Sequence, residues 1–138
     1  MEATHVAAIE AIFASINPAM LDDKQLGATL TKAIDLVASM SYHPASVRRA
    51  YYGNLTKVLD RIRQQDQGGN IDIDLASLKA TLFGSDVEIE ALRMLRADAI
   101  VSMFKTSPIL TLKMKNEIVA LHADEKSSAV RDRLALVR

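Results

Sequence analysis

Apolar residues recur at steps of three and four positions along nearly the whole chain, which is the spacing of one face of an α-helix. The clearest stripe lies between Pro44 and Gln65, and its members are Val47, Tyr51, Leu55, Val58 and Ile62. The alternation typical of a strand is confined to Ile71-Asp72-Ile73-Asp74, where Asp74 is also suited to cap a following helix. The pattern therefore predicts an all-α fold.

Prolines and capping residues mark where the helices begin and end. Asp22 with Gln25, and Ser85 with Glu88, match the capping box, in which two side chains satisfy free N–H groups at a helix start. Prolines at positions 18 and 108 interrupt the helical pattern, since proline disfavours helix in the residue before it. We expect helices at residues 4–16, 22–40, 44–65, 74–83, 85–106, 108–122 and 127–138.

A short polar stretch that contains two glycines, Gln67-Gly68-Gly69-Asn70, divides the chain. It has the composition of a flexible linker. We therefore place an N-terminal domain at residues 1–66, a linker at 67–70 and a C-terminal domain at 71–138.

The composition is that of a globular protein. The chain has 138 residues, of which 49% are hydrophobic and 25% are charged, with no cysteine and zero net charge. The absence of cysteine excludes disulfide scaffolds and thiolate zinc sites. Zero net charge argues against a protein that coats nucleic acid by charge alone. Residues 41–66 nevertheless carry five basic and two acidic side chains, so this segment is locally positive.

Residues Ser41 to Ala50, inside that positive segment, have the spacing of the turn and second helix of a helix-turn-helix. The second helix of this motif enters the major groove of DNA, where arginine can bond guanine or phosphate. The residues expected to contact DNA are His43, Ala45, Ser46, Arg48, Arg49, Tyr52, Lys57 and Arg61. A structural corner between two helices has the same spacing, and this alternative stays open.

The helices expected at 85–106 and 108–122 carry apolar residues around a wider arc than one buried face needs. Burial between subunits would cover the excess, and it predicts a helical-hairpin oligomerisation domain. The residues expected at that interface are Leu92, Leu95, Ala99, Met103, Leu112 and Ile118. In the alternative, the N-terminal helices cover the second side.

Two segments of the C-terminal half, Arg96 to Met103 and Ser128 to Ala135, resemble the oligomerisation half of tailed-phage terminase small subunits. The order of a helix-turn-helix, a Gly-Gly linker and a helical return is also similar to that family. The resemblance implies a non-catalytic subunit of a viral DNA-packaging motor. Such a subunit would form a homo-oligomeric ring, bind the packaging-start site on double-stranded DNA and regulate the large terminase subunit. The chain lacks the C-terminal strand that many members have.

No enzymatic site is expected. The histidines at positions 5, 43 and 122 are too far apart in sequence to suggest a metal site, and no phosphate-binding loop is present. We therefore expect no cofactor and no metal. No apolar run approaches the ~20 residues of a membrane span, so we expect no membrane contact and a cytoplasmic location, which would be the host cytoplasm if the chain is viral. The alternative functions are a dimeric helix-turn-helix transcription regulator and a helical assembly protein without DNA contact.

Overall fold

The computed structural model describes residues 1–137, and all regular secondary structure in this range is helical. The prediction of an all-α fold is confirmed, and residues 71–74 form no strand. The elements are α1 (Glu2–Ala14), the 3-10 helix η1 (Pro18–Met20), α2 (Asp23–Ala38), α3 (Ala45–Gln64), α4 (Leu75–Phe83), α5 (Glu90–Thr106), α6 (Pro108–Leu112), α7 (Lys115–Asp124) and α8 (Ser128–Leu134).

Several helix starts follow the capping chemistry that the sequence indicates. The Asp22 carboxylate accepts from the backbone N–H of Gln25 at 2.8 Å, and the Gln25 side chain accepts from the N–H of Asp22 at 3.0 Å. Asp74 and Ser127 cap α4 and α8 with their side chains. The predicted break at Pro108 is also present, between α5 and α6.

The capping box predicted at Ser85 and Glu88 is wrong. Helix α5 begins only at Glu90, and residues 85–89 are not helical. Tertiary contacts hold this segment instead: the carbonyl of Asp86 accepts from Arg48 at 3.2 Å, and Val87 is buried. These contacts outweigh a local capping preference.

The predicted helix at 108–122 is divided into α6 and α7. The division falls at Lys113 and Met114, where the N–H of Met114 closes a turn on the carbonyl of Thr111 at 3.0 Å. The Met114 side chain is fully buried. The division therefore keeps Met114 inside the hydrophobic core, together with Leu110 of α6.

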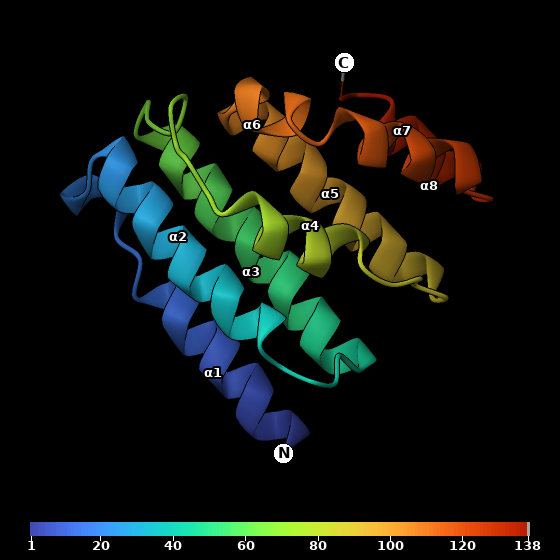
Figure 1. The fold of residues 1–138 in the computed structure, drawn as a ribbon, viewed down its shortest axis with the longest axis horizontal. Helices are drawn as coiled ribbons and strands as arrows, with labels where there is room; N and C mark the ends of the chain where they lie inside the picture. Colours follow the sequence, from blue (N-terminus) through green and yellow to red (C-terminus); the bar gives the residue numbers. More distant parts are fainter. Residues whose placement is uncertain (138) are drawn as a thin grey trace.

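Helix α3 is the central element of the fold. It packs most extensively against α5 on one side and α1 on the other, while α2 packs on α4 and α8 packs on α5. Figure 1 shows α3 between the N-terminal helices and α5, all inclined in the same direction, with α6 at the upper end of α5 and α7 and α8 beyond it. Eight residues of α3 are buried: Val47, Ala50, Tyr51, Tyr52, Leu55, Val58, Leu59 and Ile62.

The predicted linker is a turn that is held by hydrogen bonds to the start of α2 and to Leu21. The Asp23 carboxylate accepts from the N–H groups of Gly68 and Asn70 at 2.8 and 2.9 Å, and the Gln67 amide donates to the carbonyl of Leu21 at 2.6 Å. Gly68 has φ +99, which a glycine adopts without strain. Glycine in this segment therefore serves a tight turn and not flexibility.

The parts before and after this turn share their hydrophobic core. A single cluster of buried side chains includes residues of α1, α2 and α3 together with residues of α4, α5, α6, α7 and α8. The side chains of Asp60, Arg63, Ser102 and Thr106 add polar links between α3 and α5. The proposed domains at 1–66 and 71–138 stay a prediction, but they are in close contact.

Candidate partner-binding cleft

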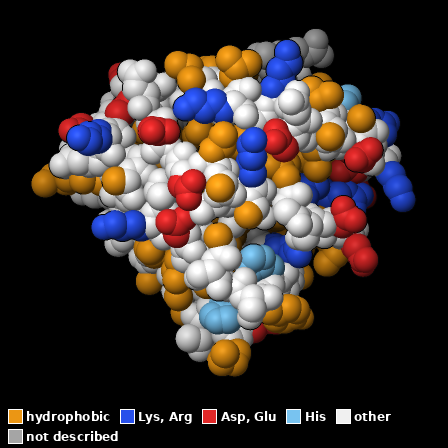
Figure 2. All heavy atoms as spheres, viewed as in Figure 1, with side chains coloured by type: hydrophobic (Ala, Val, Ile, Leu, Met, Phe, Trp, Pro, Cys, Tyr) orange, Lys and Arg blue, Asp and Glu red, His pale blue; other side chains and the backbone are white. Residues whose placement is uncertain are grey.

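A cleft of about 720 Å³ opens beside the N-terminal end of α5. Its walls are residues between Phe83 and Glu88, the side chains of Arg93 and Arg96, and residues of α7 and the following turn between Glu117 and Lys126. In Figure 2, acidic and basic side chains lie next to each other at the right edge of the molecule, over this end of α5. The cleft is thus lined by charges of both signs.

A buried ion pair closes one end of the cleft. The Nε of Arg93 donates to the two carboxylate oxygens of Glu125 at 2.9 and 3.1 Å, and the N–H of Ser127 donates to one of them at 2.9 Å. The Glu125 side chain is only 2% exposed. Burial raises the pKa of Glu125, but the hydrogen bonds from Ser127 and Arg93 outweigh it, so the pKa lies below its ordinary value.

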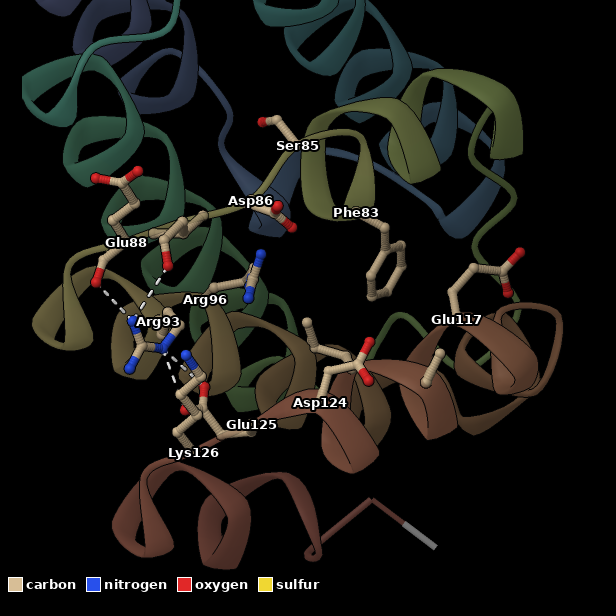
Figure 3. A pocket seen from close by; sticks show the side chains of 13 residues that line it. Phe83, Ser85, Asp86, Glu88, Arg93, Arg96, Glu117, Asp124, Glu125 and Lys126 are labelled. Atoms are coloured by element: carbon tan, nitrogen blue, oxygen red, sulfur yellow. Dashed lines mark hydrogen bonds and ion pairs between the residues drawn. The ribbon is translucent and has the colours of Figure 1, made fainter.

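Arg93 also fixes the chain that enters α5. Its Nη1 donates to the carbonyls of Val87 and Glu88 at 3.2 and 2.7 Å. One guanidinium therefore joins the non-helical segment before α5 to the turn after α7, and it holds both walls of the cleft in place (Figure 3).

Arg96 is the unusual side chain of the cleft. The residue is 4% exposed, and its Nε has no hydrogen-bond partner among residues 1–137. Burial lowers the pKa of Arg96, while the neighbouring Tyr52 and Glu125 oppose this effect. A guanidinium stays charged in proteins, so the cleft contains a buried positive charge with an unused donor.

The remaining charges are at the rim. Glu117 pairs with Lys79 at 2.8 Å, which leaves Asp86, Glu88 and Asp124 as further acidic side chains and Lys126 as a further basic one. Within residues 1–137 there is no group of three or more side chains that could hold a metal ion. The side chains present can bind and orient a charged group.

Sequence reasoning missed this site because its charges come from segments about 30 residues apart. Arg93 and Glu125 are 32 positions apart, and each looks like an ordinary surface residue when it is read alone. The available signal was weak: two arginines three positions apart on a helix with apolar residues on several sides.

Several residues predicted to contact DNA make contacts within the chain itself. The His43 ring bonds the carbonyl of Val37 at 2.8 Å, and Arg48 donates to the carbonyl of His43 at 2.7 Å. Tyr52 was expected to project outward, and this is wrong, because it is 2% exposed and packs against Tyr51 with tilted rings whose centroids are 5.8 Å apart. The cause is that α3 is covered on two sides.

The other predicted DNA-contacting residues lie nearer the surface. Ser46 donates to the Glu2 carboxylate at 2.7 Å, and Arg61 donates to the carbonyl of Phe13 at 3.4 Å. Arg49 and Lys57 are exposed on α3, and Ala45 at its start is half-buried.

Most residues predicted at a subunit interface lie inside the chain's own core. Leu92, Ala99, Met103 and Ile118 are buried, Leu95 is half-buried, and Leu112 is exposed. Helix α3 covers the second side of α5, as the alternative interpretation holds. The wide apolar arc of α5 is thus explained within one chain.

The sequence matches, over residues 1–138, the family model described as ECM29, C-terminal ARM-like repeats. The chain belongs to this family. No curated protein matches the sequence, and no solved structure does either.

Membership of the ARM-like repeat family overturns the resemblance to terminase small subunits. The predictions of a viral packaging motor, of a packaging-start site and of a large terminase partner are therefore wrong. The misleading signal was the helix corner at Ser41 to Ala50, because pairs of antiparallel helices in ARM-like repeats produce the same spacing of buried residues. Among residues 1–137 of this ARM-like chain, no helix is both long and apolar enough to cross a membrane.

Proposed function

We propose that the chain is a non-catalytic helical-repeat scaffold that assembles by stacking against further helical repeats. The observation that carries this proposal is the match to ARM-like repeats along the whole chain. In repeat proteins each unit contacts its neighbours, and stacking buries apolar surface that one unit leaves open. This function is the alternative of a helical assembly protein without DNA contact.

The C-terminal helices offer the surface for such stacking. Four large apolar side chains there are more than half exposed: Ile109, Leu112, Val119 and Leu136. Figure 2 shows hydrophobic side chains at the top of the molecule, over α6. Large exposed apolar residues concentrated on neighbouring elements indicate an interaction surface.

The partner we assign to this surface is a second copy of the chain. The same apolar side chains would then be buried on both copies in a closed, symmetric contact. Burial of apolar area contributes roughly 25 cal/mol per Å², so covering Ile109 and Leu112 of α6 would favour association.

Sedimentation velocity over a wide range of protein concentrations tests the proposal. We expect the average mass to rise with concentration for the native chain. The double variant Ile109→Lys and Leu112→Lys should weaken association at least about tenfold, since it places charge in the contact. The matched control is Met20→Lys, which changes an exposed apolar residue of η1 and should leave association unchanged. A native chain that stays monomeric throughout contradicts the proposal.

The division into a helix-turn-helix part and a helical-hairpin oligomerisation part is a prediction. The absence of enzymatic activity and the cytoplasmic location are predictions as well. Of the predicted partners, the proposal keeps a second copy of the chain.

A further inference from the structure

We propose that the cleft beside α5 binds a glutamate side chain of a partner peptide, with Arg96 as the residue that holds the carboxylate. This inference concerns a different set of side chains from the stacking surface on α6, and it does not depend on self-association. It goes beyond the scaffold function because it assigns a ligand chemistry to a specific site.

The unused donor of Arg96 is the first observation. Its Nε–H has no partner although the residue is 4% exposed. Buried polar groups are almost always hydrogen-bonded, and an exception calls for an explanation such as an absent ligand. A carboxylate is the acceptor that fits, since it can accept from Nε–H and a neighbouring Nη–H side by side.

The carboxylate nearest in the structure cannot take this role. Glu125 already accepts from Arg93 and from the backbone N–H of Ser127. The Tyr52 hydroxyl is hydrogen-bonded to Arg96, but burial raises the pKa of Tyr52, so this group stays neutral and is no counter-ion. The Nε of Arg96 is thus left without an acceptor among residues 1–137, while the residue itself lines the cleft.

The walls of the cleft suit a peptide. Phe83 and Leu121 supply apolar surface for the methylene groups of an entering side chain, and Figure 3 shows Phe83 on the opposite side from Arg93. The volume of about 720 Å³ is that of a site for a small ligand or a few side chains.

The charges at the rim of the cleft limit which charged ligands can bind. Three rim carboxylates, Asp86, Glu88 and Asp124, outnumber the one rim lysine, Lys126, so a dianionic phosphate would be repelled, whereas basic residues on either side of the bound glutamate would be attracted. The inferred ligand is therefore a glutamate flanked by lysine or arginine. A free cation is disfavoured because the buried Arg96 would repel it.

Nuclear magnetic resonance of the arginine Nε–H groups tests the inference directly. The probe is the peptide Ac-Lys-Glu-Lys-NH2, and the matched control peptide carries glutamine in place of glutamate. We expect the Arg96 Nε–H resonance of the full chain to shift on titration with the glutamate peptide and to saturate. Binding of the glutamine peptide should be at least about tenfold weaker, because the charge-assisted pair is lost.

Two variants identify the Arg96 Nε–H resonance and test the role of Arg96 in binding the carboxylate. In Arg96→Lys the charge stays but the Nε–H is removed, so the discrimination between the two peptides should fall. In Arg49→Met, which changes an exposed arginine of α3 outside the cleft, binding should be unchanged. Circular dichroism confirms that each variant is folded, and the native chain gives the decisive titration even if a variant unfolds.

Three outcomes would overturn the inference. The first is an Arg96 resonance that does not respond to the glutamate peptide. The second is an equal response to the glutamate and glutamine peptides. The third is a tighter response to inorganic phosphate than to the glutamate peptide, which would indicate a phosphate site. None of these outcomes bears on sedimentation, so failure here is distinguishable from failure of the scaffold proposal.

Discussion

At the scale of single residues, Glu125 is a buried charge on which the stability of the fold depends. Its carboxylate is almost completely buried and is compensated by Arg93 and by the N–H of Ser127. Removing one partner of a buried ion pair leaves the other charge without compensation, at a cost of about 3–5 kcal/mol. The pair therefore makes the structure sensitive both to substitution and to pH.

We expect Glu125→Gln to lower the free energy of unfolding at pH 7 by about 3 kcal/mol. The folded-state pKa of Glu125 lies below its ordinary value of 4.5. The stabilisation by the charged carboxylate is thus full above pH 4.5 and is lost as the pH falls through the folded-state pKa. Urea unfolding of both proteins from neutral to acidic pH should show the difference shrinking with acid.

The control is Glu117→Gln, which removes a partner of Lys79 whose side chain is 31% exposed, against 2% for Glu125. Exposed ion pairs contribute little to stability. A loss as large for Glu117→Gln as for Glu125→Gln would show that burial does not decide the effect.

A second prediction at this scale concerns Gly27. A Cβ at this position would lie 2.3 Å from the carbonyl oxygen of Asp72, because α2 and the segment before α4 approach closely. Although alanine is about 1 kcal/mol better than glycine inside a helix, we expect Gly27→Ala to destabilise the fold. A Cβ added at Gly53 on α3 would meet no other atom within 4 Å, so Gly53→Ala should stabilise the fold. Thermal unfolding of the two variants should give shifts of opposite sign, and shifts of the same sign contradict the argument.

At the scale of elements, the sequence predicted most helices and their caps, since these depend on local chemistry. The stripe on α3 was also correct: Val47, Tyr51 and Leu55 are all buried. The error concerned what that helix packs against. Tyr52 is off the stripe, and its burial depends on residues that are distant in sequence, which periodicity cannot reveal. The same limit hid Arg96, whose surroundings come from α3, α5 and the turn after α7.

The turn at 67–70 offers a test at the scale of elements. Asp23, at the start of α2, accepts from two N–H groups of that turn. We expect Asp23→Ala to cost about 1–3 kcal/mol, because it leaves the buried N–H of Gly68 without an acceptor. Hydrogen exchange at Gly68 and Asn70 should accelerate more than exchange elsewhere in the chain. Lys24→Ala is the control, since Lys24 is an exposed neighbour with no role in the turn. Unchanged exchange at Gly68 in Asp23→Ala would show that the turn holds without this carboxylate.

At the scale of the whole molecule, one hydrophobic cluster joins the parts on either side of the turn at 67–70. The composition of that turn suggested a boundary, but the long contact between α3 and α5 crosses it. Asp98 and Arg133 form an ion pair that extends the connected structure to α8. Shared burial of this kind predicts that the two parts unfold together.

Leu59→Ala provides the test of this cooperativity. Leu59 is fully buried on α3, and replacing a buried leucine by alanine typically costs about 2–5 kcal/mol. If the parts unfold as one unit, hydrogen-exchange mass spectrometry should show the slowest amides of α5 losing as much protection as those of α3. The matched control is Lys57→Ala on the exposed side of the same helix, which should change neither. Loss of protection confined to residues 1–66 would instead support two separately folding domains, with the contact between α3 and α5 acting as an interface.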